Sequence, residues 1–153
     1  MKKPVGNCIK GNGFGNLIND ENIKYINCLE GGFDKIVEVS AENSFKKPQN
    51  CLNYSLYYFE IKCKFEGELV NSGKILINIG LINLNLNKCV CYKAKFATIY
   101  NEKDEEFKLS TLFFNNNDIF GCGLVYPPSN KINYKFPYIF FTQNGKQIGK
   151  RIN

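Results

Sequence analysis

Apolar and polar residues alternate along much of this chain with a period of two. From Tyr57 to Phe65 the odd-numbered positions are apolar, while Glu60, Lys62 and Lys64 fall between them. Successive side chains of a strand point to opposite faces, so this pattern predicts a strand with one buried face. No segment has the apolar stripe at helical spacing that an amphipathic helix requires. The pattern therefore predicts an all-β fold.

Further segments of the same kind, separated by polar turns, are also expected to be strands. Asn144-Gly145 stands between two apolar runs and indicates a two-residue hairpin turn, because both residues tolerate positive φ. The other predicted strands are Ile23–Cys28, Lys35–Ser40, Ile75–Leu81, Ala94–Tyr100, Phe107–Phe114 and Ile119–Val125. Roughly eight or nine short strands with polar turns predict an antiparallel sandwich of two sheets.

Length and charge narrow the range of partners. The chain has 153 residues, enough for a domain with its own core, and its 20 basic and 14 acidic side chains give a formal charge of +6. Arg151 is the only arginine, so the planar groups that read guanine or grip phosphate are nearly absent. No apolar run approaches the ~18 residues of a membrane span. Neither nucleic acid nor a membrane is therefore expected as a partner.

The cysteines and the absence of histidine bear on chemistry. The chain has 7 cysteines, an odd number without the spacing of a disulfide framework, and no histidine. Cys89 and Cys91 would lie on one face if this segment were a strand, but a structural zinc site needs four ligands and usually presents C-x-x-C pairs. The commonest general base and metal ligand is missing. We expect free thiols, no metal site, no cofactor and no enzymatic activity.

The N-terminal residues bear on localisation. Met1 to Asn7 begin with lysines but contain no apolar core of a secretory signal peptide. A cytoplasmic protein is expected. The alternative is a secreted protein whose signal was removed before residue 1.

Two segments late in the chain resemble the SPRY domain family. Asp118-Ile-Phe-Gly-Cys-Gly-Leu-Val125 is similar to a family strand, and Ile139-Phe-Phe-Thr-Gln-Asn-Gly-Lys-Gln-Ile-Gly149 is similar to the hairpin that follows it. Tyr57-Tyr58-Phe59-Glu60-Ile61, Ile77-Asn78-Ile79-Gly80-Leu81 and the segment from Ile36 to Phe45 resemble earlier parts of the same family. The resemblance covers residues 24 to 149. It is closest to the Ran-binding-protein-M type and to secreted SPRY effectors of plant-parasitic nematodes, and it implies a concanavalin A-like β-sandwich.

The chain departs from the family in two ways. It has no tryptophan, where the family carries a Gly-Trp between its middle strands, and it ends at Asn153, where the family continues to a last strand. Residues 4–15 look like a shortened version of that ending. We therefore expect residues 1–20 to form an N-terminal segment that supplies the missing strand, and residues 21–153 to form the SPRY-like domain. The alternative is a truncated domain with a flexible N-terminus.

The resemblance also implies a function, because SPRY domains are interaction modules and not enzymes. It predicts a monomeric, non-catalytic adaptor or parasite effector that binds a peptide or a protein, a host protein in the case of an effector. The family binds partners through loops at one end of the sandwich, which match Ser40–Lys47, Leu84–Tyr92 and Tyr126–Phe136. The expected partner-binding residues are Glu42, Asn43, Lys46, Lys47, Asn85, Asn87, Lys88, Tyr92, Tyr126, Asn130 and Tyr134.

Two other functional classes remain open from the sequence. A lectin-like sandwich that binds carbohydrate shares the two-sheet architecture, and fold alone does not decide function. Against it stand the lack of a tryptophan platform and of an evident calcium-binding loop. An enzyme would need a carboxylate pair, such as Glu60 with Glu66 or with Asp118, but nothing in the sequence places such a pair together.

Overall fold

The computed structural model describes residues 13–19, 21–26, 36–41, 43–49, 52–65, 76–109, 114–128 and 136–153. The chain divides into two compact units, Met1–Ser44 and Phe45–Asn153. Across these ranges no helix has both the length and the apolar character needed to cross a membrane.

The described residues of the smaller unit include an antiparallel β-hairpin. Strand β1 (Phe14–Leu17) pairs with β2 (Ile23–Ile26), with Phe14 opposite Ile26 and Leu17 opposite Ile23. The side-chain oxygen of Asn19 accepts hydrogen bonds from the backbone N–H groups of Glu21 and Asn22 at 2.9 and 2.8 Å. Such a bond satisfies backbone groups in the turn and so favours the reversal of the chain.

Of the elements predicted in the N-terminal part of the chain, one is confirmed, one is wrong and one is not tested. The strand expected from Ile23 is confirmed as β2, whereas β1 was not predicted. The prediction of a strand over Lys35–Ser40 is wrong for residues 36–40, which have no regular secondary structure. Residues 4–12 lie outside the described residues. The hypothesis that residues 4–15 supply a last strand, and the boundary after residue 20, therefore stay predictions.

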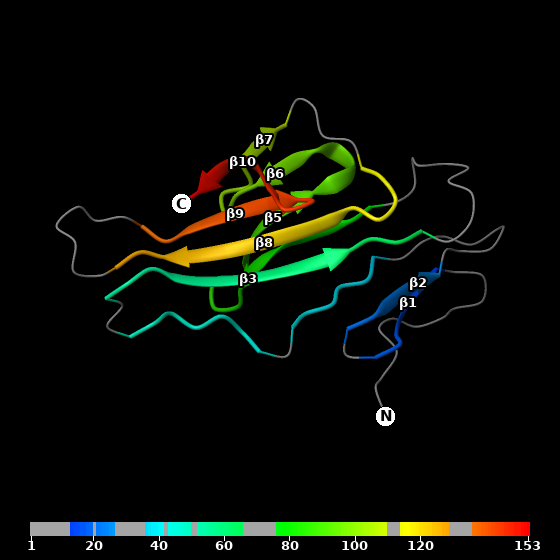
Figure 1. The fold of residues 1–153 in the computed structure, drawn as a ribbon, viewed down its shortest axis with the longest axis horizontal. Helices are drawn as coiled ribbons and strands as arrows, with labels where there is room; N and C mark the ends of the chain where they lie inside the picture. The colour runs from blue at the N-terminus through cyan, green and yellow to red at the C-terminus, as the bar shows by residue number, and fades with distance from the viewer. Residues whose placement is uncertain are drawn as a thin grey trace. The chain divides into compact units, whose positions relative to one another are not determined.

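The first sheet of the larger unit contains the two segments that carry the SPRY resemblance. Its strands are β3 (Ser55–Lys62), β8 (Ile119–Tyr126), β9 (Tyr138–Gln143) and β10 (Lys146–Ile152), in the order β10-β9-β8-β3 (Figure 1). Each neighbouring pair is antiparallel. The turn predicted at Asn144-Gly145 is confirmed, with φ values of 52° and 75° that suit a two-residue hairpin.

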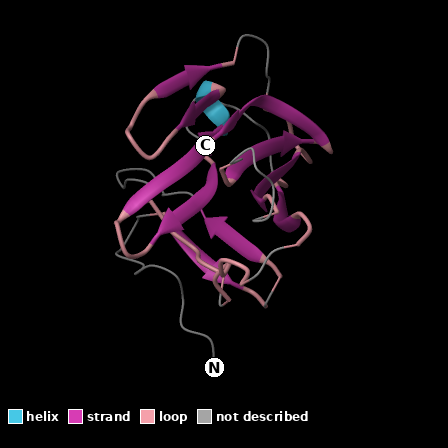
Figure 2. Cartoon of the chain, turned by 90° about the vertical axis from the view of Figure 1, so that its left-hand side faces the viewer, coloured by secondary structure: helices cyan, strands magenta, loops and turns pink. Residues whose placement is uncertain are grey.

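The second sheet contains four shorter strands. They are β4 (Asn78–Asn83), β5 (Lys88–Lys93), β6 (Thr98–Tyr100) and β7 (Glu106–Lys108), in sequence order and antiparallel. A short 3-10 helix, η1 (Ala94–Phe96), joins β5 to β6 and is the single helix among the described residues (Figure 2). The predicted all-β antiparallel fold is thus confirmed.

Three details of the second sheet correct the predicted elements. The strand expected over Ala94–Tyr100 begins only at Thr98, because residues 94–96 form η1 and Ala97 adopts a left-handed φ of 47°. The segment Leu84–Tyr92, expected to be a loop, is a turn at residues 84–87 followed by β5. The strand expected from Phe107 begins at Glu106 and ends at Lys108.

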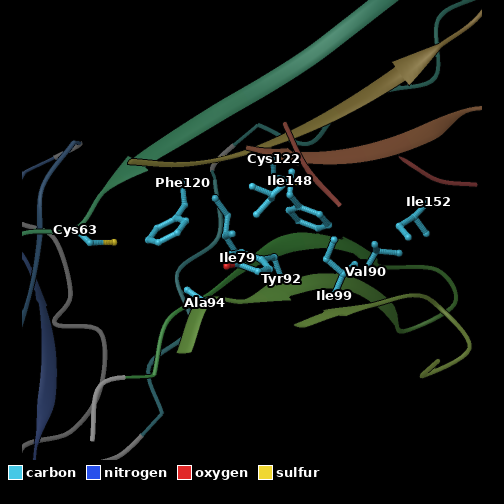
Figure 3. Packing of buried hydrophobic residues seen from close by; sticks show 11 residues of the cluster. Cys63, Ile79, Val90, Tyr92, Ala94, Ile99, Phe120, Cys122, Ile148 and Ile152 are labelled. Carbon is cyan, nitrogen blue, oxygen red and sulfur yellow. The ribbon is translucent and has the colours of Figure 1, made fainter. Parts of the chain in front are cut away.

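A shared hydrophobic core lies between the two sheets. Phe120 and Cys122 from β8 are fully buried on one side, and Tyr92 from β5 and Ile99 from β6 are 1% exposed on the other (Figure 3). Phe141 from β9, in the same sheet as β8, is also fully buried. The ring of Tyr92 lies 5.9 Å from that of Phe120 and 6.1 Å from that of Phe141, centre to centre. Two antiparallel sheets that share one core are the arrangement of a β-sandwich.

Candidate functional site

Asp118 joins the strand and the hairpin that carry the SPRY resemblance. One carboxylate oxygen accepts hydrogen bonds from the backbone N–H of Asn115 and the side-chain amide of Gln143, both at 2.8 Å, and the other accepts one from the side-chain amide of Asn144 at 2.8 Å. Burial raises the pKa of Asp118, but these hydrogen bonds outweigh it and hold the pKa below its ordinary value. The charged carboxylate therefore fixes the start of β8 to the β9–β10 hairpin.

The opposite end of the first sheet holds an aromatic cluster. Strand β3 begins where β8 ends, with Ser55 opposite Tyr126 (Figure 1). The rings of Phe45 and Tyr57 stack with their centres 4.9 Å apart, and Tyr126 meets Tyr57 edge to face at 6.2 Å. The hydroxyl of Tyr57 donates a hydrogen bond to the backbone oxygen of Lys46 at 2.7 Å. We call Phe45, Lys46, Lys47, Tyr57 and Tyr126 the loop end of the first sheet.

The loop end brings together two of the three segments expected to bind a partner. Lys46 and Lys47 come from the segment before β3, and Tyr126 begins the segment after β8. Tyr57 links them, because its ring contacts Tyr126 and its hydroxyl bonds to Lys46. Both lysines are exposed, and Tyr126 is half-buried. Burial raises the pKa of Tyr126, with the neighbouring Tyr57 adding to the effect, so its hydroxyl stays protonated near neutral pH.

The third segment supplies a turn between β4 and β5. The side-chain oxygen of Asn83 accepts hydrogen bonds from the backbone N–H groups of Asn85 and Leu86 at 3.1 and 3.2 Å. Asn87 completes the turn with a φ of 50°, a conformation that asparagine tolerates. Three of the residues expected to bind a partner are exposed on it, namely Asn85, Asn87 and Lys88.

The turn also exposes two leucines that the sequence reasoning did not select. Leu84 and Leu86 are 81% and 62% exposed. They alternate with asparagines in Leu84-Asn-Leu-Asn87, a pattern that resembles part of a strand. We call residues 84–88 the β4–β5 turn. Large apolar side chains that a fixed turn presents to solvent can contribute contact area to an interface.

Tyr92 is a correction to the predicted site. It was expected to contact a partner, but only 1% of its surface is exposed, and its ring packs in the core against Phe120 of β8 and Phe141 of β9. It points inward because it lies on the same face of β5 as buried Val90. Of the remaining expected residues, Asn43 is exposed in the smaller unit, and Glu42, Asn130 and Tyr134 lie outside the described residues.

A second aromatic surface, on the outer face of the first sheet, was also missed. The rings of Tyr58 and Phe140 stack 6.0 Å apart, and the Tyr58 hydroxyl lies 2.6 Å from a carboxylate oxygen of Glu60 and 2.7 Å from the hydroxyl of Thr142. Burial, reinforced by Glu60, raises the pKa of Tyr58. A side chain at the facing glycine, Gly121, would collide with Tyr58 and Thr142. The alternating glycines of Gly-Cys-Gly were the sequence signal for this surface.

The carboxylates considered for catalysis are engaged separately. Glu60 accepts a hydrogen bond from Tyr58 on β3, while Asp118 binds Asn115 and the hairpin residues at the start of β8. Glu66 lies outside the described residues. Among the side chains that the structure places, no group of three or more histidines, cysteines, aspartates or glutamates is arranged to hold a metal ion.

Comparison of the chain with protein-family models, with curated proteins and with solved structures finds no match.

Proposed function

We propose that this protein is a non-catalytic interaction module of the SPRY type, with a concanavalin A-like sandwich. It binds a peptide or a protein surface through the loop end of the first sheet together with the β4–β5 turn. The single observation that supports this most is the aromatic cluster in which Tyr57 holds Lys46 and Tyr126 together. A role as an adaptor, or as an effector that engages a host protein, follows from the same proposal.

Rigidity at these segments supports a binding role. Tyr57 fixes the backbone at Lys46, and Asn83 fixes the backbone of the β4–β5 turn through two hydrogen bonds. A surface that is already ordered loses little conformational entropy when a partner binds. The backbone that carries the exposed side chains of these segments is therefore ordered before a partner binds.

The chemistry of the two segments indicates which partner fits. Lys46, Lys47 and Lys88 are exposed cations, and Leu84 and Leu86 are exposed apolar side chains. The chain as a whole carries a formal charge of +6. A peptide with acidic residues beside apolar ones would gain electrostatic attraction from the lysines and apolar burial against the leucines.

A selection from a displayed peptide library tests the proposal. The selected peptides are then titrated against the wild-type protein and a loop variant with Lys47→Ala, Lys88→Ala, Leu84→Ser and Leu86→Ser. A matched control variant carries Lys103→Ala, Lys146→Ala, Leu76→Ser and Phe96→Ser, four exposed residues outside the proposed surface. Circular dichroism first establishes that all three proteins fold alike.

The proposal predicts that the loop variant loses about tenfold or more in affinity, equivalent to ~1.4 kcal/mol, while the control changes little. Equal affinity for wild type and loop variant would contradict it. A glycan array run with the same three proteins distinguishes the alternative. If the wild-type protein selects no peptide but binds a sugar, and the loop variant loses that sugar binding, the protein is a lectin and not an adaptor.

A further inference from the structure

Two free thiols lie next to each other on the outer face of the second sheet. Cys89 and Cys91 are two residues apart on β5, so both point away from the core into which Val90 and Tyr92 point. Cys89 is exposed and Cys91 is half-buried. The two side chains are close enough for Cys89 to affect the pKa of Cys91. The pair is therefore accessible to a small molecule from solvent.

The neighbouring strands accommodate Cys91 closely. Gly80 of β4 lies opposite Cys91, and a side chain there would come within 2.8 Å of the Cys91 Cα and Cβ atoms. On the other side, Tyr100 of β6 lies opposite Cys91, with the Lys93 ammonium 3.9 Å from the centre of its ring. The accessible partner for the Cys91 sulfur on this face is the sulfur of Cys89.

The two thiols differ in exposure, so we expect them to differ in reactivity. Burial, together with the adjacent Cys89, raises the pKa of Cys91 to about 11, and nearby Lys93 opposes this only in part. The Cys91 thiol is thus protonated at neutral pH, and the thiolate is the nucleophile in disulfide exchange. The exposed Cys89 is expected to react first with an external disulfide.

We propose that Cys89 and Cys91 are a site of reversible oxidation, closing to a disulfide within β5 with glutathione disulfide as the oxidant. This inference does not depend on the proposed function.

The reaction proceeds by two exchanges. The Cys89 thiolate attacks one sulfur of glutathione disulfide, forming a mixed disulfide and releasing one glutathione thiolate. Cys91 then loses its proton and attacks the Cys89 sulfur, forming the bond between the two cysteines and releasing the second glutathione. The two protein thiols are oxidised by two electrons, glutathione disulfide is reduced, and both thiol protons end on the two glutathione molecules.

The position within a strand makes the disulfide easy to reduce. Residues two apart in a strand are separated by about 6.6 Å between Cα atoms, near the upper limit for a disulfide. Closing the bond pulls the ends of Cys89-Val90-Cys91 together and displaces Val90 from the core, where it is 8% exposed. Strain of this kind favours reduction, so the bond reverses in excess glutathione.

Exchange in defined glutathione buffers, followed by acid quenching, alkylation and peptide mass spectrometry, tests the proposal. In the wild type, the peptide that contains both cysteines should lose two hydrogen atoms and resist alkylation, and reduced glutathione should reverse this. The Cys91→Ser variant should instead accumulate a glutathione adduct on Cys89. The Cys89→Ser variant should react at least about tenfold more slowly, because only the half-buried thiol remains.

Three results would overturn the proposal. The first is that the wild-type protein accumulates the glutathione adduct on Cys89 and forms no disulfide with Cys91. The second is that Cys91 in the Cys89→Ser variant reacts as fast as Cys89 in the Cys91→Ser variant. The third is Cys89 or Cys91 pairing with a different cysteine of the chain. The Cys89→Ser/Cys91→Ser double variant, checked by circular dichroism, shows how much signal arises from the other cysteines.

Discussion

At the scale of single residues, Asp118 explains why two separate sequence segments belong together. Its carboxylate accepts three hydrogen bonds, from Asn115 and from two residues at the tip of the β9–β10 hairpin. In return, the Asn144 side-chain oxygen accepts a hydrogen bond from the backbone N–H of Ile119 at 2.9 Å. The aspartate that opens the strand motif and the Asn-Gly that closes the hairpin motif are thus parts of one network.

Replacing Asp118 with asparagine should destabilise the protein substantially. An asparagine side chain has one acceptor oxygen and one NH2 donor group, so it cannot accept hydrogen bonds from all three donors. Each charge-assisted hydrogen bond contributes about 1.5 to 3 kcal/mol to stability. We expect a loss of about 2 to 3 kcal/mol in the free energy of unfolding, measured by urea denaturation. Asp104→Asn, at an exposed carboxylate, is the matched control and should change stability by less than about 0.5 kcal/mol. Equal losses for both variants would show that the network contributes nothing specific.

The same carboxylate predicts a dependence of stability on pH. The folded-state pKa of Asp118 is lowered from its ordinary value of 3.8, with burial opposing the shift and hydrogen bonds producing it. The stabilisation that the charged Asp118 contributes is therefore fully present at pH values above its ordinary pKa. It is lost as the pH falls through the lowered pKa of the folded state. The difference in unfolding free energy between wild type and Asp118→Asn should be constant near neutrality and shrink in that acid range. A difference that shrinks above pH ~5 would contradict the assignment.

Gly121 offers a test of the outer surface of the first sheet. An alanine there would collide with Tyr58 and Thr142, so we expect Gly121→Ala to cost about 1 to 3 kcal/mol. With Tyr58→Ala already present, the cost should fall by about 1 kcal/mol, because part of the collision is gone. A double-mutant cycle by urea denaturation measures this coupling. Additive effects of the two changes would show that Tyr58 does not occupy the space above Gly121.

Site residues could be predicted from the sequence only where exposure follows from local pattern. Lys46, Lys47 and Asn85 are exposed, as expected for polar residues of loops and turns. Tyr92 was misassigned because tyrosine suits both an interface and a core, and only the direction of β5 decides between them. The contact of Tyr57 with Lys46 depends on how the chain enters β3, which no local pattern specifies.

At the scale of elements, β3 forms one edge of the first sheet. Cys63, just beyond the strand, bonds through its N–H and its oxygen to residues 118 and 117, so its backbone groups face β8. Backbone direction alternates along an antiparallel strand, so the N–H groups of Tyr58, Glu60 and Lys62 face away from β8. Among the described residues no strand pairs with β3 on that side.

Proline substitutions test whether this edge is open. Glu60→Pro removes an N–H that faces away from β8, whereas Phe59→Pro removes one that bonds to it. Relative to alanine at the same position, proline should cost little at residue 60 and several-fold more at residue 59, as measured by urea denaturation. Equal costs at both positions would contradict an open edge and would indicate that a further strand, such as the one predicted from residues 4–15, pairs with β3.

Elements were predictable where one face is apolar and the other polar. The pattern of β3 and the Asn-Gly turn of the β9–β10 hairpin are of this kind. Strand β5 was missed because its outward cysteines are nearly as apolar as its inward Val90 and Tyr92, so no alternation is visible. The break before Thr98 depends on the left-handed Ala97, a conformation that alanine rarely adopts and that sequence does not signal.

At the scale of the whole molecule, the larger unit holds a core of its own. Its buried residues come from both sheets, and Phe45 at its start packs beside Tyr57 and Phe59, with ring centres 4.9 and 6.3 Å apart. We expect a fragment of residues 45–153 to fold cooperatively, with a β-type circular dichroism spectrum and a single urea transition. A fragment that shows no cooperative transition would indicate that the preceding residues complete the fold.

The most direct test of the interaction proposal is a titration of the isotope-labelled protein with a selected peptide, followed by nuclear magnetic resonance. The predicted result is that amide shifts change around Lys46, Lys47 and Tyr126 and in the β4–β5 turn, while those of the β9–β10 hairpin tip stay constant. Changes confined to the outer face of the first sheet, around Tyr58 and Phe140, would contradict the proposed binding surface.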